Sequence, residues 1–86
     1  MIFYHGTSEE NWEKIKQEGV LFGERGTPSR CTYLAVEQQE AEKYGKVVLQ
    51  VDYDPFVHPK FNNYITDCWQ IRVYEPILLE KIKRLI

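Results

Sequence analysis

A few polar and aromatic side chains of this 86-residue chain could bind or transform a ligand. His5 precedes Gly6 and Thr7, Tyr33 and Gln70 follow later, and imidazole, phenol and carboxamide groups can hydrogen-bond or stack on a small molecule. Each candidate also has a structural explanation. His5 can end a strand at a tight turn, Tyr33 can be a half-buried core aromatic, and Gln70 can lie on the polar face of an edge strand. The order of these residues therefore carries the functional argument.

The composition indicates a single small globular domain over residues 1–86. Hydrophobic residues make up 43% of the chain and charged residues 28%, which excludes disordered, collagen-like and transmembrane chains. A chain of this length buries only ~60–65% of the surface that it exposes when unfolded, so the core must be small. The net charge is −2, so no net basic field is available to hold nucleic acid, and any such binding would be local.

Cysteine usage and the absence of apolar runs predict the compartment. Cys31 and Cys68 lie far apart and outside any C-x-x-C spacing, so we expect neither a zinc site nor a disulfide framework. The first residues contain no basic segment with a long apolar run, and no stretch approaches the ~20 apolar residues of a membrane span. We therefore expect a cytoplasmic protein in a reducing compartment, with no metal and no membrane partner.

Short strands and helices must position the candidate residues. Alternating side chains predict strands, while capping residues followed by apolar residues at helical spacing predict helices. The expected strands are residues 2–5, 32–35, 47–53 and 69–74. The expected helices are residues 8–18, 37–44 and, as a short helix or turn, 78–85. Glycine, proline and asparagine predict irregular structure over residues 21–30 and 56–67.

The two longer helices have a recognisable inner side. Trp12 and Ile15 form a narrow apolar stripe on the first helix, so it should lie against the outside of a sheet. In the second helix, Ala41 and Tyr44 should share the inner side, and Gly45 is the expected C-cap.

Three segments in this order resemble the ADP-ribosyltransferase superfamily. They are FYHGTS at residues 3–8, TYLA at residues 32–35 leading into a helix that ends in Tyr44, and QIRVY at residues 70–74. The closer match is to the diphtheria-toxin and poly(ADP-ribose)-polymerase-like branch, whose signature is His, Tyr and Glu on three successive core strands. The resemblance spans Phe3 to about Ile82. It implies an α+β fold with a split, mostly antiparallel sheet, flanking short helices and a nicotinamide cleft between the halves.

The resemblance assigns roles to the first two segments. His5 matches the histidine that bonds the adenosine ribose, and Gly6, next to Thr7, matches the glycine whose backbone holds the nicotinamide carboxamide. Tyr33 and Tyr44 match two tyrosines that stack on either side of the nicotinamide ring. Two aromatic faces around a cationic pyridinium gain ~1–2 kcal/mol per good contact. His5 and Tyr33 should therefore face one cleft from the same side of adjacent strands.

The third segment departs from the family pattern. Relatives usually carry Glu at its first position, where the carboxylate bonds the 2′-hydroxyl of the nicotinamide ribose and stabilises the positive charge that develops on the sugar. Gln70 keeps the hydrogen bond and loses the charge, which is commonly worth ~3–4 kcal/mol, so slow catalysis or none is expected. Asp67 and Glu75 are the nearest carboxylates that could substitute. Trp69, Ile71 and Val73 should face the core, so Gln70 should face the cleft.

Two loops complete the expected site. Arg25 and Arg30 are the expected pyrophosphate partners, because guanidinium forks pair with phosphate oxygens, although a solvated loop explains them equally well. The resemblance also implies that the loop before the third segment helps to select the acceptor. The residues of that loop are Phe61, Asn62, Asn63 and Tyr64.

The function implied by the resemblance is NAD-dependent mono-ADP-ribosyl transfer. NAD is the substrate, nicotinamide is released, and the acceptor is a macromolecule, expected to be a protein rather than a nucleic acid. The first alternative is a catalytically weak or inactive module of the same fold that binds NAD or ADP-ribose. The second is an RNA 2′-phosphotransferase-like enzyme. The small number of arginines argues against it, because that chemistry needs several to hold phosphates. Such a compact enzyme would fit a phage or toxin origin.

Overall fold

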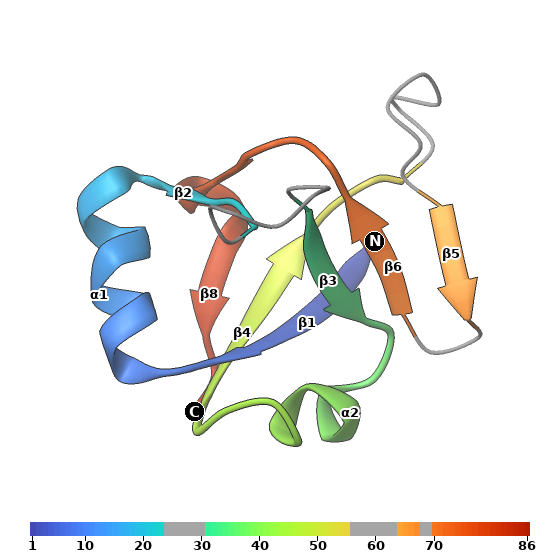
Figure 1. Ribbon diagram of the computed structural model, residues 1–86, viewed down its shortest axis with the longest axis horizontal. Coiled ribbons are helices and arrows are strands. Elements are labelled where there is room, and N and C mark those ends of the chain that lie inside the picture. Colours follow the sequence, from blue (N-terminus) through green and yellow to red (C-terminus); the bar gives the residue numbers. More distant parts are fainter. Residues whose placement is uncertain (24–30, 56–63, 68–69) are drawn as a thin grey trace.

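A computed structural model describes residues 1–23, 31–55, 64–67 and 70–86 of the chain. Within these ranges the protein is a small α+β fold with a mostly antiparallel sheet and two short α-helices (Figure 1). The elements in chain order are β1 (Ile2–Thr7), α1 (Glu9–Glu18), β2 (Val20–Leu21), β3 (Thr32–Ala35), α2 (Gln38–Glu42), β4 (Val47–Asp52), β5 (Tyr64–Asp67), β6 (Gln70–Val73), β7 (Ile77–Leu78), the 3-10 turn η2 (Leu79–Lys81) and β8 (Ile82–Arg84).

The six-stranded sheet is divided between its two central strands. Its order is β5-β6-β3-β1-β4-β8, with antiparallel pairing between neighbours. β1 pairs with β4 along its whole length, and β3 pairs with β6 along its whole length. In contrast, β1 and β3, both fully described, register only through Tyr4 and Ala35. Beyond that pair, β1 and β3 separate, and with them the two halves of the sheet.

The larger hydrophobic core lies between one face of this sheet and a layer formed by α1 and the β2–β7 pair. α1 contributes Trp12 and Ile15, and the β2–β7 pair contributes Leu21 and Ile77. The central strands contribute alternate residues: Phe3, Leu34, Val47, Leu49, Val51, Ile71 and Val73. Full burial of such side chains stabilises the fold by ~1.5–3 kcal/mol each. The apolar stripe predicted for the first helix is confirmed.

The opposite face of the sheet is covered by α2. Ala35, Ala41 and Val48 form a second, smaller cluster, and Tyr4 packs against it. Successive residues of a strand point to opposite faces, so the neighbours Val47 and Val48 are buried in different clusters. α1 and α2 therefore lie on opposite sides of the central strands.

The caps of α1 match the sequence pattern closely. The Ser8 hydroxyl accepts a hydrogen bond from the backbone N–H of Asn11 at 3.1 Å, as expected of an N-cap. Gly19 ends the helix in the left-handed conformation, with φ of 76°, and its N–H donates to the carbonyl of Ile15 at 2.8 Å. The predicted helix over residues 8–18 is confirmed, and Ser8 fixes where it begins.

The second helix differs from its prediction. α2 ends at Glu42 with Lys43 as its C-cap, so neither Tyr44 nor Gly45 has the expected place in the helix. Tyr44 lies in the following turn and is 63% exposed, so it does not share the buried side of Ala41. A Cβ on Gly45 would collide with the backbone of Thr7. The close approach of these two backbones, rather than a helix end, explains this glycine.

Two further segments were predicted wrongly. Residues 64–67 form β5 instead of irregular structure, because they pair along β6 with a register shift between Ile65 and Asp67. The segment expected to be a short helix or turn over residues 78–85 contains the 3-10 turn η2, but most of the rest of it belongs to the strands β7 and β8. β8 pairs with β4, for example through Ile82 and Val51, so backbone pairing at the sheet edge prevails over the weak helical pattern. Trp69 and residues 56–63 lie outside the described residues.

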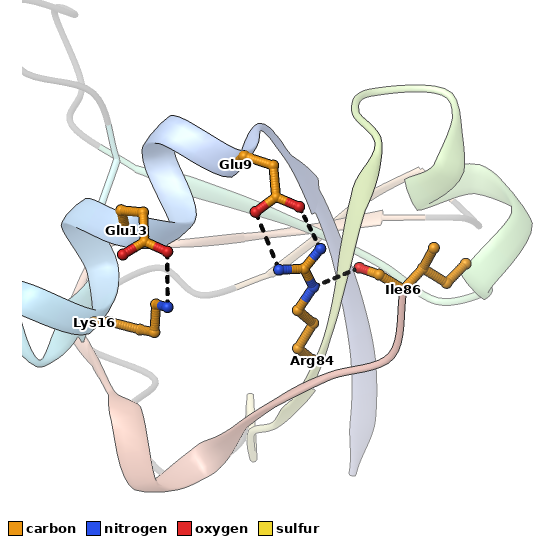
Figure 2. Close-up of polar contacts among 5 residues, drawn as sticks. All are labelled: Glu9, Glu13, Lys16, Arg84 and Ile86. Carbon is orange, nitrogen blue, oxygen red and sulfur yellow. Dashed lines mark hydrogen bonds and ion pairs between the residues drawn. The ribbon is translucent and has the colours of Figure 1, made fainter.

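Arg84 connects this last strand to the start of α1 (Figure 2). Its guanidinium contacts both carboxylate oxygens of Glu9, with Nη1 3.1 Å from Oε2, and its Nε donates to the carbonyl of Ile86 at 2.9 Å. The hydrogen bond lowers the pKa of Glu9 and raises that of Arg84. Two residues 75 positions apart in the chain thus form a two-contact ion pair beside the β1–α1 junction.

Candidate functional site

A cleft of about 1140 Å³ is lined by the parting ends of β1 and β3. The rest of its described lining comes from α1, from β2 and the two residues after it, from Cys31, from α2 and Tyr44 in the turn after it, and from the beginning of β6. The lining includes predicted site residues from all three sequence segments: His5, Gly6, Thr7, Tyr33, Tyr44 and Gln70. Residues that are far apart in the sequence are therefore brought to one place.

The remaining predicted site residues are not placed in this cleft. Arg25 and Arg30 lie outside the described residues, as do Phe61, Asn62 and Asn63. Tyr64 is the first residue of β5. The predicted pyrophosphate and acceptor roles of these residues stay predictions.

His5 is held by the neighbouring strand. Its Nδ1 lies 2.9 Å from the carbonyl oxygen of Tyr33, and because a carbonyl can only accept, this hydrogen bond assigns the proton to Nδ1. Burial lowers the pKa of His5, and the bond to Tyr33 only partly opposes that effect. The imidazole is therefore neutral at pH 7, and its Nε2 keeps a lone pair that can accept a hydrogen bond from a ligand.

His5 and Tyr33 reach the cleft from opposite faces of the sheet. His5 shares the face of Phe3 in the large core, whereas Tyr33 shares the face of Ala35. The predicted adjacency of their strands is confirmed, and the expected common face is wrong. Both residues line the cleft because it extends between strands that no longer pair.

The α2 side of the cleft is aromatic. Tyr33 is 50% exposed and Tyr44 63% exposed, so both rings are accessible to a ligand. Gly6 lies beneath them, and a Cβ on it would collide with the carbonyl oxygen of Ala41 and lie 3.2 Å from Cβ of Tyr44. The glycine thus lets α2 approach β1 and sets Tyr44 at the cleft. This packing role is one that the sequence did not reveal.

Gln70 occupies the cleft face of its strand. It is half-buried and begins β6, opposite Ala35 of β3, while Ile71 and Val73 are fully buried in the core. The predicted division of faces is confirmed for these three residues of β6.

Carboxylates are scarce in the described lining of the cleft. Glu18 is the only one there, at the far end of α1. Glu75, a predicted substitute for the missing glutamate, instead accepts a hydrogen bond at 2.6 Å from the Tyr53 hydroxyl. Both line a separate hollow of about 380 Å³, so Glu75 does not replace the charge that Gln70 lacks.

The wall of the cleft on the side of α1 was missed by the sequence analysis. One side of α1 lines it, through Ser8, Asn11, Lys14, Ile15 and Glu18. The spacing of three and four residues puts these side chains on one helix face, but it does not show that this face lines a cleft. Lys14 belongs to this face of the helix. In the described lining it is the only ammonium or guanidinium group.

Known proteins give no independent guide to this site. No family model, curated protein or solved structure matches the chain. Within the described residues, no group of three His, Cys, Asp or Glu side chains is placed to hold a metal ion. No helix in that part of the chain has the length and apolar character needed to cross a membrane. The functional argument therefore depends on the cleft itself.

Proposed function

We propose that this protein binds NAD in the cleft and transfers the ADP-ribosyl group to a macromolecular acceptor, with release of nicotinamide. One observation carries the proposal: His5, Tyr33 and Gln70, from three separate segments, line the same cleft. The resemblance of these segments to ADP-ribosyltransferases implied that such a cleft should exist. The parting of β1 and β3 supports an ADP-ribosyltransferase-like split sheet. The opposite faces of His5 and Tyr33 are the feature that fits this resemblance least.

The volume and the lining of the cleft suit a dinucleotide. Its volume of about 1140 Å³ exceeds that of many small-molecule sites, which span ~300–1,000 Å³. The exposed rings of Tyr33 and Tyr44 offer aromatic surface to the nicotinamide ring. The free Nε2 of His5 can accept a hydrogen bond from a ribose hydroxyl. These groups support the proposed binding of NAD.

The proposed transfer breaks the bond between the nicotinamide nitrogen and the ribose C1′. The electron pair of that bond returns to the nitrogen and neutralises the pyridinium, while the sugar develops positive charge. A nucleophile of the acceptor forms the new bond to C1′ and loses its proton to solvent. Gln70 can hydrogen-bond the ribose but supplies no negative charge, so transfer is slow.

A binding module of low activity is the second candidate function. It is favoured by one specific feature, since Gln70 is neutral and the only carboxylate in the described lining is Glu18 of α1. An RNA 2′-phosphotransferase has less support, because that chemistry needs several cations and the described lining supplies only Lys14.

Calorimetric titration with NAD tests the proposed function. We expect saturable binding by the parent chain, weakened by roughly 1–3 kcal/mol in Tyr33→Ala because stacking is lost. Leu78→Ala is the matched control, since Leu78 is 52% exposed and lies outside the cleft lining. Failure of the parent chain to bind NAD or ADP-ribose would contradict the proposal. Equal affinity of Tyr33→Ala and the parent would remove the stacking role.

A further inference from the structure

The two walls of the cleft differ in chemistry. On the side of α2 the lining is aromatic, with Tyr4, Tyr33 and Tyr44. On the side of α1 it carries the polar side chains of Thr7, Ser8, Asn11, Lys14 and Thr32 beside the apolar Ile15, Val20, Leu21 and Phe22. The two sides correspond to the two faces of the sheet, since α1 packs on the large core and α2 on the cluster around Ala35. A ligand that spans the gap between β1 and β3 therefore meets an aromatic and a polar environment.

The buried hydroxyl of Thr32 has no hydrogen-bond partner among the described residues, and Thr32 lines the α1 side of the cleft. Its residue exposure is 3%, and no described residue hydrogen-bonds its Oγ1. It immediately precedes Tyr33 on β3 and faces the same side as Leu34. Buried polar groups in native structures nearly always have a hydrogen-bond partner, so an unpaired hydroxyl in a cleft lining points to a ligand.

Lys14 is the cation that this wall can offer to a ligand. Its Nζ lies 3.9 Å from Glu10, a loose and exposed pair. Lys16, two residues along the same helix, is held more tightly at 2.8 Å by Glu13, as Figure 2 shows, and lies over the Trp12 ring. Lys16 does not line the cleft. Of these two lysines, Lys14 alone is therefore placed to meet an anionic ligand.

We infer that the α1 wall binds the ribosyl-diphosphate half of the dinucleotide, with the Thr32 hydroxyl hydrogen-bonding a ligand oxygen and Lys14 pairing with the diphosphate. The inference rests on the proposed function and extends it to two residues that the sequence analysis did not select. The aromatic wall then receives the nicotinamide half. His5, on the same face of the sheet as Thr7, contacts a ribose hydroxyl of the ligand.

The two halves of the ligand can be tested separately. Calorimetric titration with ADP-ribose probes the polar wall, and titration with nicotinamide probes the aromatic wall. Thr32→Val keeps the shape of the side chain and removes the hydroxyl, whereas Thr32→Ser keeps the hydroxyl. Lys14→Gln removes the charge at the cleft, and Lys16→Gln is its control on the same helix.

We expect Thr32→Val to bind ADP-ribose about 10-fold more weakly, while Thr32→Ser stays near the parent. Thr32→Val should also melt a few degrees higher, because it buries a methyl group in place of an unpaired hydroxyl. A merely structural threonine would not move affinity and stability in opposite directions. Lys14→Gln should weaken ADP-ribose binding by roughly 5-fold and flatten its salt dependence. Lys16→Gln should do neither, and nicotinamide binding should be unchanged in all four variants.

Each contrary result has its own meaning. If Thr32→Val binds ADP-ribose as tightly as the parent, the role of Thr32 is overturned. A lower melting temperature of Thr32→Val also overturns it, because it would show that the hydroxyl has a hydrogen-bond partner within the fold. Equal effects of Lys14→Gln and Lys16→Gln overturn the role of Lys14. If the parent binds ADP-ribose and these variants match it, the proposed function stands without this inference. If the parent binds neither NAD nor ADP-ribose, both fail.

Discussion

The Nδ1 atom of His5 lies 2.9 Å from the carbonyl oxygen of Tyr33, beyond the point where β1 and β3 cease to pair. The His5 side chain thus hydrogen-bonds across β1 and β3 at a point where the two backbones are no longer paired. The bond fixes the imidazole orientation, assigns the proton to Nδ1 and leaves Nε2 for a ligand. The cleft therefore depends on a polar contact at the opening of the sheet.

The lowered pKa of His5 predicts that stability declines in mild acid. The unfolded chain, with a histidine pKa near 6.5, takes up its proton before the folded chain does. Stability is therefore lost as the pH falls below about 6.5. Thermal unfolding from about pH 7.5 to about pH 5.5 should show a falling melting temperature, in a range above the ordinary titration of carboxylates.

His5→Asn is the control for this pH dependence. Its amide nitrogen can donate to the Tyr33 carbonyl in place of Nδ1, and it does not titrate. The variant should show a flatter dependence of melting temperature on pH. A slope equal to that of the parent would assign the effect to groups other than His5.

Gln70→Glu should increase nicotinamide release from NAD by roughly 100-fold or more, because a carboxylate stabilises the positive charge on the ribose in the transition state. NAD affinity should change little. Nicotinamide release is measured for both forms at about pH 7, where a carboxylate of ordinary pKa is ionised.

Gln50→Glu provides the matched control for this charge. Gln50 is a half-buried glutamine of β4 outside the cleft lining, so the same change of charge there should leave the rate unaffected. A Gln70→Glu variant that binds NAD and is no faster than the parent would favour the non-catalytic binding module.

Gly6→Ala should destabilise the fold and weaken NAD binding together. The added Cβ would collide with the Ala41 carbonyl, so α2 and the turn carrying Tyr44 must move away from β1. We expect a loss near the upper end of the ~1–3 kcal/mol that overpacking costs, measured by denaturant unfolding.

Gly19→Ala separates these two effects. A Cβ on Gly19 meets open space, but the positive φ of 76° costs a non-glycine residue roughly 1–2 kcal/mol. This variant should lose stability with little change in NAD affinity. Retention of full NAD binding by folded Gly6→Ala would contradict the role of Gly6 in placing Tyr44.

The Glu9–Arg84 pair should stabilise the fold in a salt-dependent manner (Figure 2). Both groups are exposed, so Arg84→Gln should lower the melting temperature at about 0.05 M salt and much less at about 0.5 M. A double-mutant cycle of Glu9→Gln with Arg84→Gln isolates the coupling. The same cycle for Glu13 and Lys16 provides a comparison within a single helix. Coupling that is unchanged by salt would contradict an electrostatic contact.

Local pattern was sufficient for most of the secondary structure. Alternation predicted β1, β3, β4 and β6, and the capping signals of Ser8 and Gly19 predicted α1, because these features depend on neighbours within a few residues. The resemblance of three segments to ADP-ribosyltransferases implied that His5, Tyr33 and Gln70 share a site. The pattern on β6 correctly separated Gln70 from the buried Ile71.

Only the tertiary structure decided how these pieces meet. β8 is a strand because β4 offers it backbone partners, and no local period of residues 82–84 contains that information. The cleft arises where β1 and β3 stop pairing, which the alternation of either strand cannot reveal. For the same reason Lys14 and Thr32 were not identified, since each has an ordinary local pattern and gains its place in the cleft only from elements distant in the chain.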